Sequence, residues 1–389
     1  MTKIFLKRCP GYHSPKVTET VAGLLDQLSL DRPLASKGQT VLVKPNMLSC
    51  KTPDHAATTH PAVVEAVAAY FVKTGARVLI GDSPPAVFGR AEEYWSRTGF
   101  AEAAKNSGAE LVCFETIAKQ TIEISTNRQK HQAHVVKLAF DADLIVNLPK
   151  LKTHNLTRIT GAVKNLFGLV PGLQKAVWHK VFPKSLEFSN FIVDFARQMP
   201  AGITLLDAIE GMEGQGPAGG KRIFPGFLMA STCPVAIDRA ICRIGGIDEN
   251  TVSMLNRARE LSWGPTNVDQ LEFRGDSPND VKISNFQVPG RPVQDYLPDL
   301  LLNSLKKLVW AGPALKAATC IGCGRCKEIC PVNAIDIVDK TAQFDRRTCI
   351  SCFCCMEVCP VDAIEAQKSP LLNLAFKLRN LKKAFKRNK

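Results

Sequence analysis

Eight cysteines near the C-terminal end of the chain have the spacing of iron–sulfur ligands. The pattern C-x2-C-x2-C-x3-C-P occurs twice, in TCIGCGRCKEICPVNAI from Thr319 and in TCISCFCCMEVCPVDAI from Thr348. Thiolates hold iron–sulfur clusters, and in this pattern the fourth cysteine of each run binds the other cluster. We therefore expect two 4Fe-4S clusters, one held by Cys320, Cys323, Cys326 and Cys359 and the other by Cys349, Cys352, Cys355 and Cys330.

Two other uses of clustered cysteines fit this spacing less well. A four-cysteine zinc site uses paired C-x2-C knuckles and not triplets, and a disulfide scaffold belongs to a secreted chain. Residues 319–366 resemble a bacterial-type ferredoxin with two 4Fe-4S clusters, and that resemblance implies one-electron transfer. The remaining cysteines are expected to be ordinary small residues; they are Cys9, Cys50, Cys113, Cys233, Cys242 and Cys354.

Positive charge is concentrated at the C-terminal end. The net charge is +14, and eight Lys or Arg residues with no Asp or Glu lie within residues 366–389. A protein that coats nucleic acid spreads its charge over a face or groove, so we do not expect nucleic acid as a partner. The chain contains no apolar run long enough to span a membrane and no signal peptide at its start, so a cytoplasmic location is expected.

The basic tail has the pattern of an amphipathic helix. From Leu371 onward, apolar residues recur at helical spacing between lysines and arginines. Such a helix can lie on an anionic membrane surface or bind an acidic redox partner. The alternative is that it packs on the chain's own ferredoxin domain.

The N-terminal part of the chain alternates short apolar runs with helical patterns. Strands are expected at residues 41–43, 78–81, 144–146 and 203–206, and a helix is expected from His60-Pro61 to Gly75. This alternation predicts an α/β fold with a mostly parallel sheet flanked by helices. The small C-terminal domain is expected to be α+β.

Each of these four strands is followed by a polar residue. They are Lys44 with Asn46, then Asp82, Asn147 and Asp207. In open α/β sheets, ligands bind beyond the carboxyl ends of the strands. These side chains are therefore expected to converge on one crevice, although strand ends are often polar for no reason other than exposure to solvent.

The segment NLPKLKTHNLTRITGAVKNLFG, residues 147–168, carries several cations and no acid. In an extended backbone, Lys150, Lys152 and His154 would share one side. A helix from Leu156 or Thr157 would add Lys164 and Asn165, with Gly161 and Gly168 allowing close approach. The cations are either solvated, paired with remote acids such as Asp82, Asp207 or Glu213, or neutralised by a bound carboxylate, phosphate or sulfonate.

A G-x-G-x-x-G sequence at Gly214, Gly216 and Gly219 is not expected to bind a dinucleotide. That fingerprint needs a helix directly after the glycines to meet the pyrophosphate. Here Pro217 interrupts the motif, and the following KRIFPGFLM is typical of a strand. The segment is therefore interpreted as an acidic, glycine-rich loop.

Five motifs occur in the order found in one protein family. They are VLVKPNML, TTHPAVVEAVAAYFVKTGARVLIGDSP, NLPKLKTHNLTRITGAVKNLFG, LLDAIEGMEGQGP and PVAIDRAI. Residues 38–247 resemble the domain of unknown function 362 family, whose members are often joined to a two-cluster ferredoxin module. The resemblance implies no particular reaction, but it marks the family's patterned polar positions: Lys44, Asn46, Thr59, His60, Asp82, Ser83, Asn147, Lys150, Lys152, His154, Lys164, Asn165, Glu213 and Asp238.

Four segments are expected: an α/β domain at 1–299, a linker at 300–318, the ferredoxin-like domain at 319–366 and the tail at 367–389.

One hypothesis is an oxidoreductase in which the clusters pass electrons to an anionic small molecule. The alternatives are an electron-transfer protein that recognises a partner protein, and a protein whose clusters are structural or sense oxygen. For the enzyme we expect catalysis by His154, Lys152, Asp82, His60 and Glu213, and substrate binding by Lys44, Asn46, Asn147, Lys150, Lys164 and Asn165.

Overall fold

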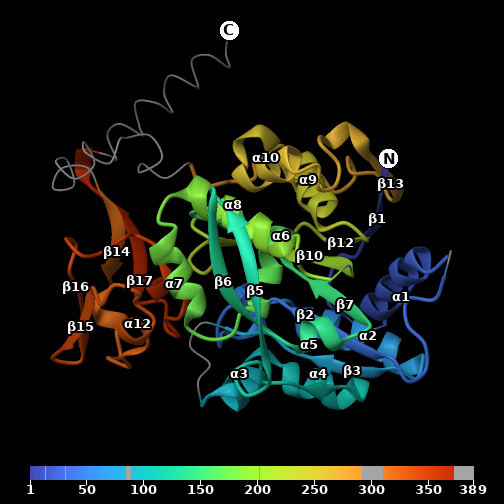
Figure 1. Cartoon of the computed structure of the whole chain (residues 1–389), viewed down its shortest axis with the longest axis horizontal. Coiled ribbons are helices and arrows are strands. Elements are labelled where there is room, and N and C mark those ends of the chain that lie inside the picture. Colours follow the sequence, from blue (N-terminus) through green and yellow to red (C-terminus); the bar gives the residue numbers. More distant parts are fainter. Residues whose placement is uncertain (14, 31, 85–88, 201, 291–309, 372–389) are drawn as a thin grey trace, which may run out of the picture.

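An eleven-stranded sheet forms the centre of the N-terminal domain (Figure 1). The computed structural model describes the chain except for residues 14, 31, 85–88, 201, 291–309 and 372–389. The main strand order is β13-β1-β12-β10-β7-β2-β3-β4. These strands are β1 (Thr2–Arg8), β2 (Thr40–Pro45), β3 (Arg77–Ile80), β4 (Glu110–Leu111), β7 (Leu144–Leu148), β10 (Ile203–Glu213), β12 (Phe227–Ser231) and β13 (Leu271–Gly275).

Most of this sheet is parallel, as expected. Strands β10, β7, β2, β3 and β4 run in one direction, and β12 is antiparallel to both of its neighbours. Along the chain, β2 is followed by β3 and β4 on one side and later by β7 on the other. The connections therefore change direction between β2 and β7, which is where ligands bind in open α/β sheets.

Alternating side chains of the central strands enter two separate cores. On β2, Val41 and Val43 pack in one core while Leu42 packs in the other. On β7, Val146 and Ile145 divide in the same way. This alternation is the two-residue period of a strand whose two faces are both covered.

Helices cover both faces of the sheet, with α3 and α4 below it and α9 and α10 above it in Figure 1. The first face is covered by α1 (Lys16–Leu28), α2 (Pro61–Lys73), α3 (Ala91–Thr98) and α4 (Phe100–Ser107). The other face is covered by α6 (Gly161–Asn165), α8 (Ser185–Ala196), α9 (Pro234–Gly245) and α10 (Ser253–Glu260). The short helix α5 (Leu138–Asp141) and the hairpin of β5 (Lys119–Thr126) and β6 (Gln129–Val136) complete this domain, with α7 (Gln174–Val181) facing the C-terminal module.

Three further strands lie at the carboxyl end of β10. Strand β8 (Lys150–His154) pairs in parallel with β10 and antiparallel with β9 (Arg158–Ile159). Strand β11 (Lys221–Ile223) forms a hairpin with β10, and Pro225 separates it from β12. The predicted KRIFPGFLM strand is therefore two strands, because proline cannot donate to a sheet ladder.

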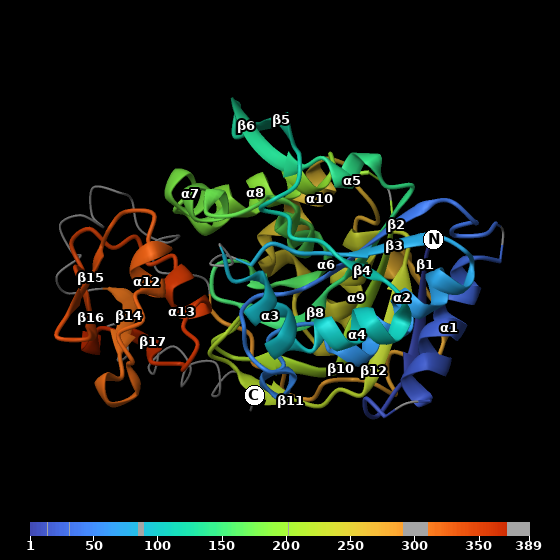
Figure 2. The same ribbon diagram turned by 90° about the horizontal axis from the view of Figure 1, so that it is seen from below.

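The C-terminal module packs beside the large domain, as the red and orange elements of Figure 2 show. Its strands are β14 (Ala311–Leu315), β15 (Ile335–Val338), β16 (Thr341–Phe344) and β17 (Ile364–Lys368), and its helices are α12 (Arg325–Glu328) and α13 (Cys354–Glu357). Strand β14 pairs antiparallel with β17. Residues 311–315, which the sequence analysis assigned to the linker, are thus the first strand of this module.

The predicted tail at 367–389 and the first part of the predicted linker lie mostly outside the described residues. Within the part of the chain that the structure describes, no helix is both long enough and apolar enough to cross a membrane.

Candidate functional site between the two domains

The cations of residues 147–168 do not share one partner. The side chains of Lys150 and Lys152 on β8 are both buried. Lys150 Nζ is 2.9 Å from Asp207 Oδ2 and donates to the hydroxyl of Tyr12 at 2.5 Å. Lys152 Nζ donates to Asn46 Oδ1 at 2.7 Å and to the backbone oxygen of Ala57 at 2.6 Å. The strand therefore supplies two different polar clusters.

In the Asp207 cluster, which is one of the two, the polar groups bind one another. His60 stacks on Tyr12 with ring centroids 3.5 Å apart, and its backbone N–H donates to Asp207 Oδ2 at 2.9 Å. Burial lowers the pKa of His60 to about 4. Burial also lowers the pKa of Lys150, although Asp207 opposes that shift. This cluster has the form of a satisfied buried ion pair.

The second cluster lies where the sheet changes direction. Asn46 follows β2, and its Nδ2 donates to Asn165 Oδ1 at 2.9 Å. Asn165 Nδ2 in turn donates to Asn147 Oδ1, on β7, at 2.8 Å. A chain of three amides therefore bridges the two strand ends and presents Asn46 Oδ1 to Lys152.

Asp82 and Lys44 form a buried ion pair next to this amide chain, with Lys44 Nζ 2.8 Å from Asp82 Oδ1. Asp82 Oδ2 accepts a hydrogen bond from the backbone of Met47 at 2.7 Å. A Cβ at Gly168 would collide with both charged groups, so only glycine fits there. Because of burial, the pKa of Lys44 is lowered.

Helix α6 begins at Gly161. The sequence predicted an earlier start, at Leu156 or Thr157. The backbone of Arg158–Ile159 pairs with β8 instead, which delays the helix. The carboxylate of Asp238 on α9 accepts from the backbone N–H of Ala162 at 2.5 Å and occupies the space that a Cβ at Gly161 would need. Burial raises the pKa of Asp238 to about 7. This remote carboxylate fixes the helix that carries Lys164 and Asn165.

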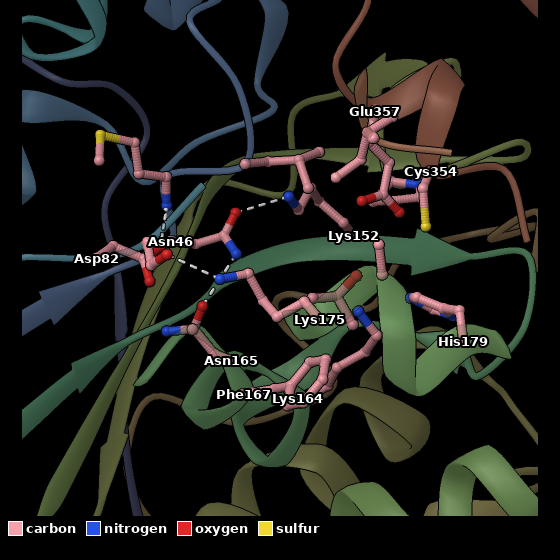
Figure 3. A pocket seen from close by; sticks show the side chains of 18 residues that line it. Asn46, Asp82, Lys152, Lys164, Asn165, Phe167, Lys175, His179, Cys354 and Glu357 are labelled. Carbon is pink, nitrogen blue, oxygen red and sulfur yellow. Dashed lines mark hydrogen bonds between the residues drawn. The ribbon is translucent and has the colours of Figure 1, made fainter. Parts of the chain in front are cut away.

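A cavity of about 70 Å³ opens beside the amide chain (Figure 3). Lys152 of β8, Lys164 of α6 and Lys175 of α7 enter it from the large domain. The C-terminal module contributes a wall that includes Glu357 and Cys354 of α13. Such a volume holds ordered waters or a small ligand. Its other lining residues are Asn46, Met47, Leu48, Asp82, Ser83, Thr160, Asn165, Phe167, Gly168, Ala176, His179, Pro217 and Ile329.

The three cavity lysines differ in how their ammonium groups are held. Lys175 Nζ donates to Ser83 Oγ at 2.8 Å and to the backbone of Val170. Among the described residues, Lys164 makes no hydrogen bond or ion pair. Burial lowers the pKa of all three lysines, to about 8 for Lys175. Glu357 is the nearby acid that opposes the shift at Lys152 and Lys164.

His154 faces the module from the end of β8. Its Nδ1 accepts from the backbone N–H of Leu156 at 3.0 Å and of Thr157 at 3.3 Å. Burial lowers the pKa of His154 well below its ordinary value, so the imidazole is neutral and its proton is assigned to Nε2. His154 Nε2 lies 3.8 Å from Glu357 Oε1.

Several buried polar atoms at this site have no hydrogen-bond partner in the described part of the chain. They include Thr160 Oγ1, His179 Nδ1 and His154 Nε2. Thr160 and His179 line the cavity itself, and burial lowers the pKa of His179 to about 3. Unpaired buried polar groups are costly, so their convergence on one cavity indicates a site prepared for a ligand or for ordered water.

Three predicted site residues lie elsewhere, and one of them is Lys150, which pairs with Asp207. His60 belongs to the Asp207 cluster, and Glu213 accepts from the backbone N–H of Gln287 at 2.9 Å. The single crevice expected from four strand ends is therefore two clusters, because the irregular pairing of β8 with β10 directs Lys150 away from Lys152. Sequence reasoning missed Lys175, His179, Thr160 and Glu357. Only the excess of nearby cations hinted at a distant acid.

The eight predicted cluster ligands are divided between two further cavities in the module. One is lined by Cys320, Cys323, Cys326 and Cys359, and the other by Cys330, Cys349, Cys352 and Cys355. Backbone N–H groups donate to the sulfurs of Cys330 at 3.2 Å, Cys349 at 3.4 Å and Cys359 at 3.2 Å. Such hydrogen bonds to sulfur are found at iron–sulfur centres, so both cysteine sets fit a cluster. Cys354 also lines the second of these cavities.

Ion pairs hold the module against the large domain. Arg325 on α12 binds both carboxylate oxygens of Glu93, at 2.8 and 2.9 Å, and donates to Cys50 Sγ at 3.0 Å. Lys51 pairs with Asp362. Charged contacts therefore also join the two domains outside the lining of the cavity.

This fold and these cysteines define an iron–sulfur protein with an α/β domain and a ferredoxin-type module. The model described as Domain of unknown function (DUF362) matches residues 41–243, and the 4Fe-4S dicluster domain matches residues 319–363. The thylakoid-associated protein sll1697 of Synechocystis sp. is 31% identical over 306 residues, which are 78% of this chain and 93% of that protein. The chain belongs to the DUF362 family, which confirms the resemblance seen in its motifs.

Among solved structures, the lactate racemase apoprotein from Thermoanaerobacterium thermosaccharolyticum is similar over 53% of this chain. The match spans 50% of that chain, with 14% sequence identity and a TM-score of 0.33. A likeness at this level carries no argument about activity.

Proposed function

We propose that this protein is an oxidoreductase that passes electrons from two 4Fe-4S clusters to a small anionic molecule bound in the cavity between its domains. The observation that carries this proposal is the position of Cys354. This residue lines both the cavity and the space surrounded by Cys330, Cys349, Cys352 and Cys355. A molecule in the cavity would be separated from that cysteine set by one layer of residues.

The proposed cluster ligands are the two cysteine sets named above. When bound, such clusters supply one-electron transfer. The exposed thiol of Cys323 in the first set favours electron entry there from a redox partner protein. The second set lies on the cavity side, so the two sets would connect the surface with the bound molecule.

Anion binding is assigned to the cavity lysines. Lys164 has no partner in the described part of the chain, while Lys152 and Lys175 are held in place by Asn46 and Ser83. The Lys44–Asp82 pair contributes no net charge. When all three lysines are protonated, Glu357 supplies at most one negative charge against their three positive charges. A bound carboxylate or phosphate would supply the missing negative charge.

Proton delivery is assigned to Glu357, with His154 as the residue that positions its carboxyl group. Organic groups that accept two electrons also need protons in most cases, supplied by a positioned acid. The Nε2–H group of neutral His154 points toward the module and lies 3.8 Å from Glu357. Glu357 lines the cavity, and burial raises the pKa of its carboxyl group, so this group would hold the proton and give it to a bound molecule. His154 would orient that carboxyl group, because a neutral imidazole is too weak an acid to release its own Nε2 proton.

The alternative is an electron-transfer protein with no catalytic site of its own. It is favoured by Ile321, which lies next to the first cysteine set with 61% of its surface exposed and offers an apolar contact to a partner protein.

We propose a cytoplasmic location, with peripheral membrane contact through the basic tail as a further proposal. The related Synechocystis protein is named as thylakoid-associated, and that description applies to that protein.

Anaerobic reoxidation kinetics test this function. The reduced full-length protein is mixed with a panel of small carboxylates and phosphates, and cluster absorbance is followed. At least one anion should accelerate reoxidation saturably in the wild type and fail to do so in Lys152→Met. If no anion has an effect while a protein acceptor reoxidises the clusters rapidly, the electron carrier is the correct function.

A further inference from the structure

The two cysteine sets have different electrostatic surroundings. The first set includes the exposed Cys323, and among the described residues the only charged one that lines its cavity is Arg325. Arg325 is already neutralised by Glu93. The second set borders the cavity that contains three lysines. A charge change at the second set would therefore be felt in the cavity much more strongly than one at the first set.

Lys164 is the lysine best placed to transmit such a change. It enters the cavity opposite α13 and faces the wall formed by Cys354 and Glu357 (Figure 3). Its ammonium group has no hydrogen bond or ion pair to any described residue, whereas Lys152 and Lys175 are each held by two oxygens. The free ammonium group of Lys164 can stabilise negative charge on either side of that wall.

We infer that anion binding in the cavity and electron uptake at the second cysteine set oppose each other, with Lys164 as the coupling residue. This inference rests on the proposed function. One electron added behind the Cys354 wall brings one negative charge next to the anion, and both charges depend on the same lysine. No bond forms or breaks in this step. The electron comes from a chemical reductant such as dithionite.

The coupling must act equally in both directions. An anion that binds the oxidised protein more tightly than the reduced protein lowers the reduction potential by the same free energy. A tenfold difference in affinity corresponds to about 59 mV for a one-electron couple. Substrate binding would thereby make the neighbouring centre a stronger reductant at the moment when an acceptor is present.

The test is a potentiometric titration of the full-length, iron-loaded protein, monitored by electron paramagnetic resonance. Inorganic phosphate and propionate serve as probes, and their affinities for the oxidised protein are measured separately by calorimetry. One of the two potentials should fall in the presence of a probe that binds, and the other should stay constant. In Lys164→Met and Lys164→Gln the shift should shrink at least threefold, with iron content unchanged.

Lys180→Met is the matched control, because Lys180 is an exposed lysine on α7 and its charge is screened by solvent. It should retain the full shift. Binding of a probe with neither potential changed would overturn the coupling while leaving the proposed function intact. Failure of both probes to bind would overturn the coupling and the anion site together. An equal shift of both potentials would show a general charge effect and contradict the role of Lys164.

Discussion

His154 Nε2 lies 3.8 Å from Glu357 Oε1, although the two residues belong to different domains. His154 ends β8 of the large domain, and Glu357 ends α13 between the last two cysteines of the second run, Cys355 and Cys359. This contact joins the cationic segment to the iron–sulfur module. It supplies the acid that the cations of residues 147–168 lack in their own neighbourhood.

Replacing His154 should separate proton delivery from anion binding. In His154→Gln, we expect anion-dependent reoxidation to slow by up to about 10²-fold, because Glu357, the proton donor, loses the residue that positions it. The affinity for the anion should change little, because His154 does not line the cavity. His60→Asn is the control, since asparagine can still cap α2 and His60 lies in the Asp207 cluster. A normal rate in His154→Gln would remove this residue from the mechanism.

Lys150 and Lys152 should have different roles despite their spacing. Lys150→Met leaves Asp207 buried without its cation, and the free energy of unfolding should fall by roughly 3–5 kcal/mol. Anion affinity should stay near that of the wild type. Lys152→Met should weaken anion binding instead. Denaturant unfolding and calorimetry on both variants measure these effects, and loss of anion binding in a folded Lys150→Met protein would contradict the division into two clusters.

Anion affinity should fall as the pH rises through about 8. Burial lowers the pKa of Lys175 to about 8, so its ammonium group is charged below that pH and neutral above it. A surface lysine would keep its charge until much higher pH. Between pH 7 and pH 10 we expect the affinity for a small anion to drop by about tenfold or more. Calorimetry at several pH values measures this, and Lys175→Met should bind weakly at every pH without the step near 8.

Iron content should distinguish the ligand cysteines from their neighbour. Cys330→Ser removes a proposed ligand of the second set and should reduce iron from about eight to about four atoms per chain. Cys354→Ser should retain about eight, because Cys354 is not in either ligand set. Iron and acid-labile sulfide analysis after anaerobic purification gives the answer. Equal losses in both variants would mean that Cys354 is itself a ligand.

Much of the fold could be predicted from local patterns. The apolar runs before Lys44, Asp82, Asn147 and Asp207 are strands, and α2 begins directly after His60 and ends just before Gly75. These features depend on periodicity and on helix signals that lie close together in the sequence. The division of the cysteines between two cavities also follows a short-range spacing.

The partners of the buried charges could not be predicted in the same way. Glu357 meets His154 only because two domains pack together, and Asp238 caps α6 from a helix much later in the chain. The irregular register between β8 and β10 sends Lys150 to Asp207. Such contacts depend on tertiary packing, and no local pattern in the sequence encodes them.

The central claim is that the anion and the second cysteine set occupy opposite sides of the Cys354 wall. Electron–nuclear double resonance on the reduced, iron-loaded protein saturated with inorganic phosphate tests it most directly. We predict a resolved ³¹P coupling in the wild type that disappears in Lys164→Met. Saturated phosphate binding without any ³¹P coupling would place the anion far from the cluster and contradict this account.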